Sequence, residues 1–168
     1  MFAANVPIRI TEAKPADVPL ILSLIRELAD YERMSDEVVA TESDIERSLF
    51  SSRPYAEAVI AWLDNTPAGF ALFFHSFSTF VGRPGLYLED LFVRPVHRGR
   101  GVGRQLLAYV ARLAVDRGCG RFEWSVLDWN ELAIGMYRKA GAVPMDKWTV
   151  FRLTGDALHT LASEANDE

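Results

Sequence analysis

Residues 98–104 of this chain, Arg-Gly-Arg-Gly-Val-Gly-Arg, place a glycine at every second position among three arginines, a pattern that suits the binding of an anion. The glycines allow positive φ angles, so that successive N–H groups can converge at the start of a following helix. The helix dipole adds partial positive charge there, and the arginines add full charges with bidentate geometry for phosphate oxygens. The predicted phosphate-binding residues are Arg98, Gly99, Arg100, Gly101, Val102, Gly103 and Arg104.

The spacing of the glycines separates this segment from two common phosphate loops. A Walker loop needs four residues between its first glycine and a Gly-Lys-Ser/Thr run, and the chain contains no such run. A dinucleotide fingerprint has two residues before its third glycine and an acid at the end of the next strand. Here the order is Gly-x-Gly-x-Gly in mid-chain, and the next candidate strand, 121–126, is followed by Leu-Asp-Trp-Asn. Both alternatives therefore fit poorly.

The run Arg98-x-x-Gly101-x-Gly103, placed after a strand, resembles the pyrophosphate-binding motif of the GNAT superfamily of N-acetyltransferases. A second block, residues 129–142, is similar to the superfamily segment that carries Asn130, Ala133 and Tyr137 at matching spacing. The chain resembles most closely the diamine (spermidine/spermine-type) and thialysine acetyltransferase group, nearly from end to end. The block Tyr-Leu-Glu-Asp-Leu-Phe-Val at 87–93 is the most specific part of that resemblance.

The resemblance implies acetyl-CoA as co-substrate, no metal, and a small-molecule amine as acceptor. In such a fold, the strand that holds the cofactor splits from its neighbour at a bulge, which would fall within residues 88–93. Leu91, Phe92 and Val93 would bond the pantetheine amides, and the N–H of Phe92 or a neighbour would hold the oxyanion. Asn130, Ala133 and Tyr137 complete the implied cofactor contacts.

Acetyl transfer to an amine requires a proton acceptor and a proton donor. A protonated alkyl amine, with a pKa of ~10.4, must lose a proton before it attacks a thioester. Glu89 and Asp90 point to opposite faces if their strand is regular, and we prefer Glu89 as the catalytic base with Asp90 second. Tyr137 is the expected general acid for the departing thiolate. For the two acids, the structural alternative is solvation at a strand edge or a salt bridge. For Tyr137, the structural alternative is a place in the core on an amphipathic helix.

The same resemblance implies substrate contacts at Tyr31, Glu32 and Glu89, together with Asp90, and a homodimer with the site near the subunit interface. Several acids suit an acceptor with two or more ammonium groups, because each buried cation needs a partner. The chain has Leu132 and Ala133 where the group often has Pro-Ser, so the acceptor stays open. Alternatives are a protein lysine or N-terminal acetyltransferase and, with less support, a non-catalytic acyl-CoA-binding domain.

Apolar periodicity predicts the elements that position these residues. Strands are expected at 8–10, 56–63, 68–76, 86–93, 121–126 and 148–153, and helices at 17–28, after a capping box at 41–44, at 105–117, at 131–140 and from 154. Residues 64–67 and 77–85 are expected as a turn and a loop. This order predicts a mixed α/β domain of the GNAT type, with a mostly antiparallel sheet flanked by helices.

Length and composition predict one domain, 1–168, with a frayed tail at 163–168. Hydrophobic residues make up 49% of the chain, which supplies one core and excludes general disorder. One cysteine excludes an internal disulfide, and three scattered histidines give no metal-ligand spacing. The net charge of −5 disfavours nucleic-acid binding, and the chain shows neither a signal peptide nor an apolar run of membrane length. A cytoplasmic protein without nucleic-acid or membrane partners is expected.

Overall fold

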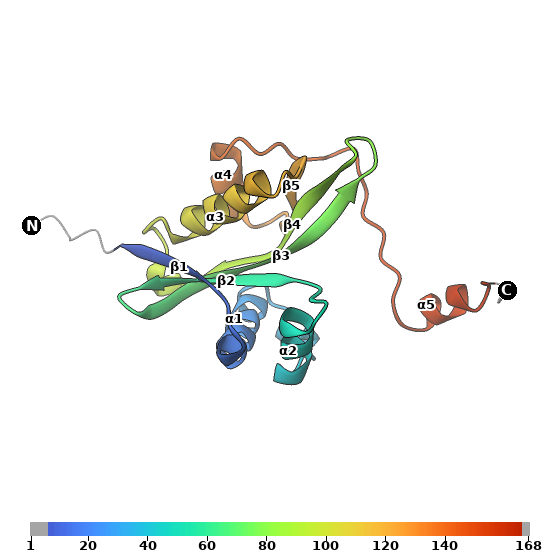
Figure 1. Cartoon of the computed structure of the whole chain (residues 1–168), viewed down its shortest axis with the longest axis horizontal. Coiled ribbons are helices and arrows are strands. Elements are labelled where there is room, and N and C mark those ends of the chain that lie inside the picture. The colour runs from blue at the N-terminus through green and yellow to red at the C-terminus, as the bar shows by residue number, and fades with distance from the viewer. Residues whose placement is uncertain (1–6, 166–168) are drawn as a thin grey trace, which may run out of the picture. The chain divides into compact units, whose positions relative to one another are not determined.

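Five strands form one mixed sheet in the computed structural model, which describes residues 7–165 (Figure 1). They are β1 Ile8–Glu12, β2 Glu57–Leu63, β3 Thr66–Ser78, β4 Arg83–Val93 and β5 Arg121–Trp124, in the spatial order β1-β2-β3-β4-β5. The first four strands pair antiparallel, and β5 pairs parallel with β4. The predicted mixed, mostly antiparallel sheet is confirmed.

Helices cover both faces of this sheet (Figure 1). On one face lie α1 (Val18–Tyr31) and α2 (Glu42–Phe50), and on the other lies α3 (Val102–Asp116). Each helix buries the residues that recur at helical spacing, as an amphipathic pattern requires. Three buried groups result, namely Ile21, Leu49, Ala58 and Ile60 between α1, α2 and β2, then Leu24, Leu28, Phe70 and Phe92 between α1 and the β3–β4 pair, and Val102, Leu106, Leu107 and Val110 on α3.

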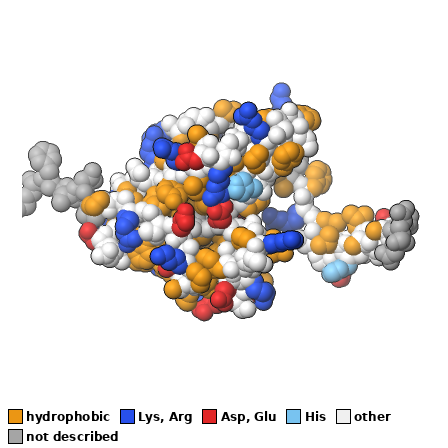
Figure 2. Space-filling view, viewed as in Figure 1, with side chains coloured by type: hydrophobic (Ala, Val, Ile, Leu, Met, Phe, Trp, Pro, Cys, Tyr) orange, Lys and Arg blue, Asp and Glu red, His pale blue; other side chains and the backbone are white. Residues whose placement is uncertain are grey.

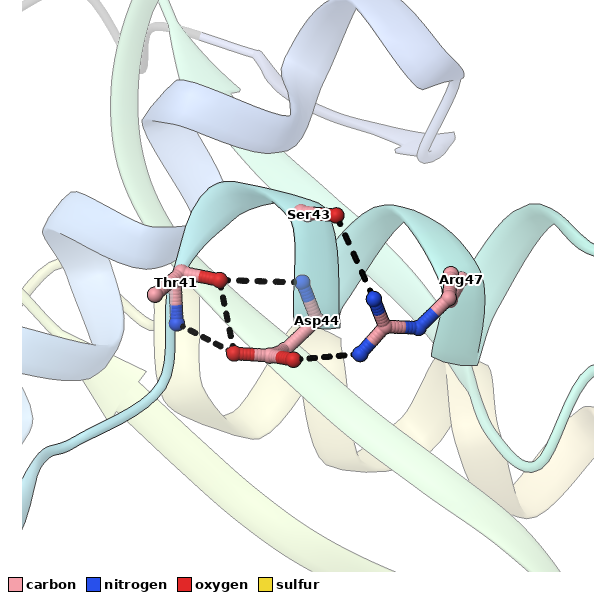
Figure 3. A network of polar contacts seen from close by, with 4 residues as sticks. All are labelled: Thr41, Ser43, Asp44 and Arg47. Atoms are coloured by element: carbon pink, nitrogen blue, oxygen red, sulfur yellow. Dashed lines mark hydrogen bonds and ion pairs between the residues drawn. The ribbon is translucent and has the colours of Figure 1, made fainter.

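The predicted capping box begins α2 (Figure 3). The Asp44 amide donates to the Thr41 hydroxyl at 3.3 Å, and the Thr41 amide donates to the Asp44 carboxylate at 2.9 Å. Arg47 forms an ion pair with the same carboxylate at 2.5 Å. Two helix-terminal donors are thereby satisfied, which fixes where the chain leaves the loop after α1. Short 3₁₀ turns lie at Pro15–Asp17, Ser35–Glu37 and Pro95–His97.

The connections between strands are shorter than the sequence predicted. Asp64 and Asn65 alone, both at positive φ, make the β2–β3 turn, while Thr66 and Pro67 belong to β3. The loop expected at 77–85 shrinks to residues 79–82, because Phe77 pairs with Pro84 and Ser78 with Arg83. The serine, glycine and proline there predicted a loop by composition, but they continue the β3–β4 ladder to its end.

The chain divides into two compact units, residues 1–127 and 128–168. The sheet and α1 to α3 form the first unit, and the second contains α4 (Glu131–Lys139) and α5 (Gly155–Ala162). The strand predicted at 148–153 is wrong, since these residues have no regular secondary structure. β-Branched and aromatic residues favour a strand but do not by themselves form one. The single domain 1–168 remains a prediction, and residues 166–168 of the expected tail lie outside the described part.

Within residues 7–165 no helix has both the length and the apolar character to cross a membrane. The same residues contain no cluster of three or more histidine, cysteine, aspartate or glutamate side chains that could hold a metal ion.

Candidate functional site

Strand β4 departs from regular pairing with β3 at Glu89. Leu72 pairs with Asp90 and the next residue, Phe73, pairs with Leu88, so Glu89 is an extra residue on β4. Such a β-bulge bends its strand and redirects the neighbouring side chains. The bulge expected within 88–93 is thus confirmed, and the strict alternation that would place Glu89 and Asp90 on opposite faces does not hold there.

Beyond the bulge, β4 has a free edge. The parallel pairing of β4 with β5 ends at Leu88 and Trp124, whereas β4 continues to Val93. The Arg94 amide donates to the Ala68 carbonyl at 2.9 Å, which directs the N–H of Phe92 toward β3 as well, because successive amides of a strand alternate in direction. The amides of Leu91 and Val93 therefore face the free edge. Of the three residues expected to bond an extended ligand, these two present N–H groups to it.

The glycine-arginine segment leads into α3 as an anion site would require. Gly99 and Gly101 have φ angles of 74° and 84°, and a Cβ added to either would meet nothing within 4 Å. Gly101 is the N-cap of α3, so the helix begins at Val102 rather than at the predicted residue 105. Gly103 is consequently helical and does not need positive φ. The first-turn amides of α3 have no intrahelical acceptors, and the exposed side chains of Arg100 and Arg104 flank them in sequence.

Arg98 has a different position from the other two arginines. Its Nε donates to the Val93 carbonyl at 2.9 Å, and its guanidinium lies over the ring of Tyr31, 4.2 Å from the centroid. A cation over an aromatic face is attracted by the ring quadrupole. Arg98 therefore links the end of β4 to the end of α1, a contact that the sequence did not predict.

Three carboxyl groups gather beside the bulge. Burial raises the pKa of Asp90 from 3.8 to about 7, and the charges of Glu89 and Glu32 add to this effect. Burial also raises the pKa of Glu32, which directly follows α1. Because like charges in a partly desolvated site oppose ionisation, the cluster holds a proton near neutral pH or attracts a cation. The predicted residues Tyr31, Glu32, Glu89 and Asp90 thus all lie in the first unit around one end of α1 and the bulge of β4.

An ion pair that the sequence analysis missed fixes this arrangement. Arg94 donates from Nε and Nη2 to the two oxygens of Glu27 at 2.8 and 2.7 Å, and from Nη1 to the Pro67 carbonyl at 2.9 Å. The bidentate pair lowers the pKa of Glu27 and joins α1 to the end of β4. The partners are 67 residues apart, so no local pattern could have found them.

The second unit carries the remaining predicted residues on or beside α4. The Asn130 side chain caps this helix by accepting from the Ala133 amide at 3.2 Å, as its position at the predicted helix start indicated. Tyr137 lies two helical turns beyond Asn130 on nearly the same face of α4. It is half-buried.

Comparison with known proteins identifies the family. Residues 22–142 match the Acetyltransferase (GNAT) family, and this range covers most of the first unit and the part of the second unit that contains α4. The chain belongs to the GNAT family. It is therefore an N-acetyltransferase, and acetyl-CoA is the co-substrate that this family uses.

Individual relatives of this GNAT enzyme extend over nearly its whole length. The thialysine N-epsilon-acetyltransferase of Bos taurus is 37% identical, over 94% of this chain and 98% of its own. The L-ornithine N5-acetyltransferase NATA1 of Arabidopsis thaliana is 35% identical, over 91% of this chain and 87% of its own. Among solved structures, a Vibrio cholerae integron cassette protein superposes with a TM-score of 0.77 at 26% identity, covering 92% of this chain and 97% of that one. These relatives include the group that the sequence predicted.

Proposed function

We propose that this GNAT enzyme transfers the acetyl group of acetyl-CoA to a primary amine of a small acceptor that carries a second positive charge, such as thialysine or a di- or polyamine. The observation that carries this proposal is the cluster of Glu32, Glu89 and Asp90 beside the free edge of β4. The similarity of the chain to a thialysine and an L-ornithine acetyltransferase supports it.

Acetyl-CoA supplies an activated thioester. Residues of the first unit fit its two polar regions, which are the pyrophosphate and the amide-containing pantetheine arm. The first-turn amides of α3 and the side chains of Arg100 and Arg104 would hold the pyrophosphate, and the open space at Gly99 and Gly101 supports such close approach. The free edge of β4 would bond the pantetheine arm through Leu91 and Val93. One of these amides would also donate to the thioester oxygen as negative charge develops on it.

The acidic cluster would serve both binding and proton transfer. Ionised carboxylates attract an ammonium group of the acceptor and compensate it for lost hydration. Glu89 was the preferred base from sequence, with Asp90 second, but burial reverses this order in our proposal. A base works best when its pKa lies near the operating pH, and the pKa of Asp90 is about 7. We therefore assign proton uptake to Asp90 and ammonium binding to Glu89 and Glu32.

Tyr137 is the proposed general acid that protonates the departing thiolate. Its phenol has an ordinary pKa of ~10 against ~8.5 for a thiol, so the transfer is only moderately uphill and can occur as the bond breaks. The match of residues 22–142 to the GNAT family supports this role, because it includes the helix that carries Tyr137. Asn130 and Ala133 are proposed to shape the same cofactor region through the N-terminal turn of that helix.

A panel of acceptors tests the proposed function. Release of coenzyme A thiol is followed with thialysine, ornithine, spermidine, putrescine, lysine and a lysine-containing peptide. Selective turnover of the small dicationic acceptors is expected. Preferential turnover of the peptide, or acetyl-CoA binding without turnover of any acceptor, would overturn the proposal.

We also propose that the enzyme acts in the cytoplasm as a homodimer.

Replacement of Tyr137 by phenylalanine tests the acid separately. Tyr137→Phe should lower kcat by ~10²–10⁴-fold while acetyl-CoA binding, measured by calorimetry, persists. Tyr55→Phe is the matched control, because Tyr55 is exposed and lies in the loop before β2. Unchanged kcat in Tyr137→Phe would remove the assignment and leave the acceptor proposal standing.

A further inference from the structure

A hydrogen bond between side chains spans the point at which β4 and β5 part. The two strands pair in parallel as far as Leu88 and Trp124, and we call the point beyond this last pair the fork. The Tyr87 hydroxyl lies 2.7 Å from the hydroxyl of Ser125, the first residue after β5. This distance is typical of an O–H···O hydrogen bond. The Tyr87 side chain therefore reaches from β4 to the end of β5 directly beside the fork.

The ring of Tyr87 is also held by β3. Its centroid lies 5.2 Å from that of the Phe74 ring, and the two ring planes are inclined by 34°. Phe74 is the residue opposite Tyr87 in the β3–β4 ladder, so the strand pairing keeps the two rings together. A side chain held at its tip by a hydrogen bond and along its ring by a second ring cannot turn aside without losing both contacts. Tyr87 is thus a rigid boundary of the fork.

Tyr87 lies on the same face of the sheet as the carboxyl group of Asp90. Phe70, Leu72 and Phe74 alternate along β3, so their side chains share one face, and Phe70 packs against α1. Residues directly opposite each other in a ladder also share a face. Phe74 pairs with Tyr87, and Leu72 pairs with Asp90. The phenol and the carboxyl are therefore neighbours across the bulge, on the face that α1 covers.

The proposed placement of acetyl-CoA would bring its acyl end to the fork. The proposed pyrophosphate site lies at Gly101 and the start of α3, beyond the C-terminal end of β4. The pantetheine arm joins the pyrophosphate to the thioester, so an arm bonded along the free edge from Val93 runs back toward Leu88. The free edge ends at Leu88, because β5 pairs with β4 from there onward. The acyl group would therefore meet the fork, with Tyr87 beside it.

We infer that Tyr87, held in place by Ser125, limits the length of the acyl group that this enzyme accepts. An acetyl group carries one methyl on its carbonyl carbon, whereas a butyryl group carries two further methylenes that must pass the phenol. A single methylene that fits or fails to fit a site changes discrimination by roughly 10–200-fold. The inference rests on the proposed course of the pantetheine arm and does not depend on which amine is acetylated.

Calorimetric binding of acyl-CoA thioesters in the absence of an acceptor amine tests the inference. The dissociation constants of butyryl-CoA and acetyl-CoA are measured, and the first divided by the second is the acyl ratio. Both thioesters carry the same charges, so the mixture of acidic and basic side chains on the face drawn in Figure 2 affects them alike and cancels in the ratio.

Removal of the Tyr87 side chain should abolish the selectivity. Wild type should show an acyl ratio of at least ~10. Tyr87→Ala should lower the ratio to about one or below, because the side chain that excludes the longer acyl group is absent and the added methylenes gain apolar contact. Tyr55→Ala is the control, because Tyr55 lies in the loop before β2, and it should keep the wild-type ratio.

Replacement of Ser125 by alanine tests the hydrogen bond with a smaller change. Ser125→Ala removes the partner of the phenol but leaves the contact between the rings of Tyr87 and Phe74 in place. The acyl ratio should therefore fall between those of wild type and Tyr87→Ala. A ratio equal to that of wild type would overturn the part assigned to Ser125.

Two results would overturn the inference as a whole. They are a wild-type acyl ratio near one and a ratio that Tyr87→Ala leaves unchanged. Gly101→Ala separates these results from a failure of the proposed cofactor site, since it should weaken the binding of coenzyme A, acetyl-CoA and butyryl-CoA by the same factor. Unweakened binding of all three would contradict that site and, with it, the course of the arm on which the inference rests.

Discussion

Replacement of Asp90 by asparagine should stabilise the protein increasingly as the pH rises. Burial and the charges of Glu89 and Glu32 raise the pKa of Asp90 from 3.8 to about 7. Between these two values the folded protein holds a proton that the unfolded chain has released, so wild-type stability falls with rising pH. Each unit by which the folded-state pKa exceeds the unfolded value corresponds to about 1.4 kcal/mol of unfolding free energy. The wild-type protein therefore loses about 4 kcal/mol of stability by neutral pH. Asparagine has no such ionisation and keeps that stability.

Urea unfolding of wild type and Asp90→Asn between pH 4 and 8 measures this difference. The gap in unfolding free energy between the two proteins should widen with pH through this range and level off above pH 7. Asp36→Asn, at an exposed site of the same residue type, should leave the curve unchanged. A gap that stays constant with pH would refute the argument that Asp90 is held protonated by its surroundings. In kinetics, Asp90→Asn should also abolish the acid limb of kcat/KM near pH 7.

Three further changes test the parts that position the site. Arg94→Gln should cost ~1–3 kcal/mol in urea unfolding, because it breaks a half-buried bidentate pair and leaves Glu27 without its cation. Gly101→Ala should raise the KM for acetyl-CoA but not for the acceptor. Gly118 also has a positive φ and open space around it, so Gly118→Ala should cause similar backbone strain and leave both KM values unchanged. Thr41→Ala should lower the melting temperature by breaking the capping box and leave kcat/KM unaffected.

Local chemistry made much of this structure predictable. The capping box at Thr41, the N-cap at Asn130 and the apolar stripe of α1 depend on residues three to seven positions apart, and all three are confirmed. The glycines also predicted that a helix begins directly after them. The helix α3 begins at Val102 rather than at the predicted residue 105, because Gly101, at positive φ, is its N-cap. Short-range hydrogen bonding and side-chain periodicity are visible in sequence because they act within one or two turns.

Features that depend on distant partners were not predictable. The strand predicted at 148–153 has no regular secondary structure, because β-propensity depends on the surroundings of a segment more than on its own residues. The ion pair of Glu27 with Arg94 and the contact of Arg98 with Tyr31 join segments far apart in the chain. The raised pKa of Asp90 follows from burial beside two other carboxyl groups, one of which, Glu32, comes from a different element. These properties arise only when the chain folds.

The most direct test of the acidic cluster compares two acceptors that differ in one charge. The ratio of kcat/KM for 1,4-diaminobutane to that for 1-aminobutane is measured with wild type, Glu32→Gln and the control Glu37→Gln, whose site is exposed beyond α1. A charge-assisted contact to the second ammonium predicts a wild-type ratio of ~10–100, lost in Glu32→Gln and kept in Glu37→Gln. A ratio near one in wild type, or one that Glu32→Gln leaves unchanged, would contradict the assignment of these carboxylates to the acceptor.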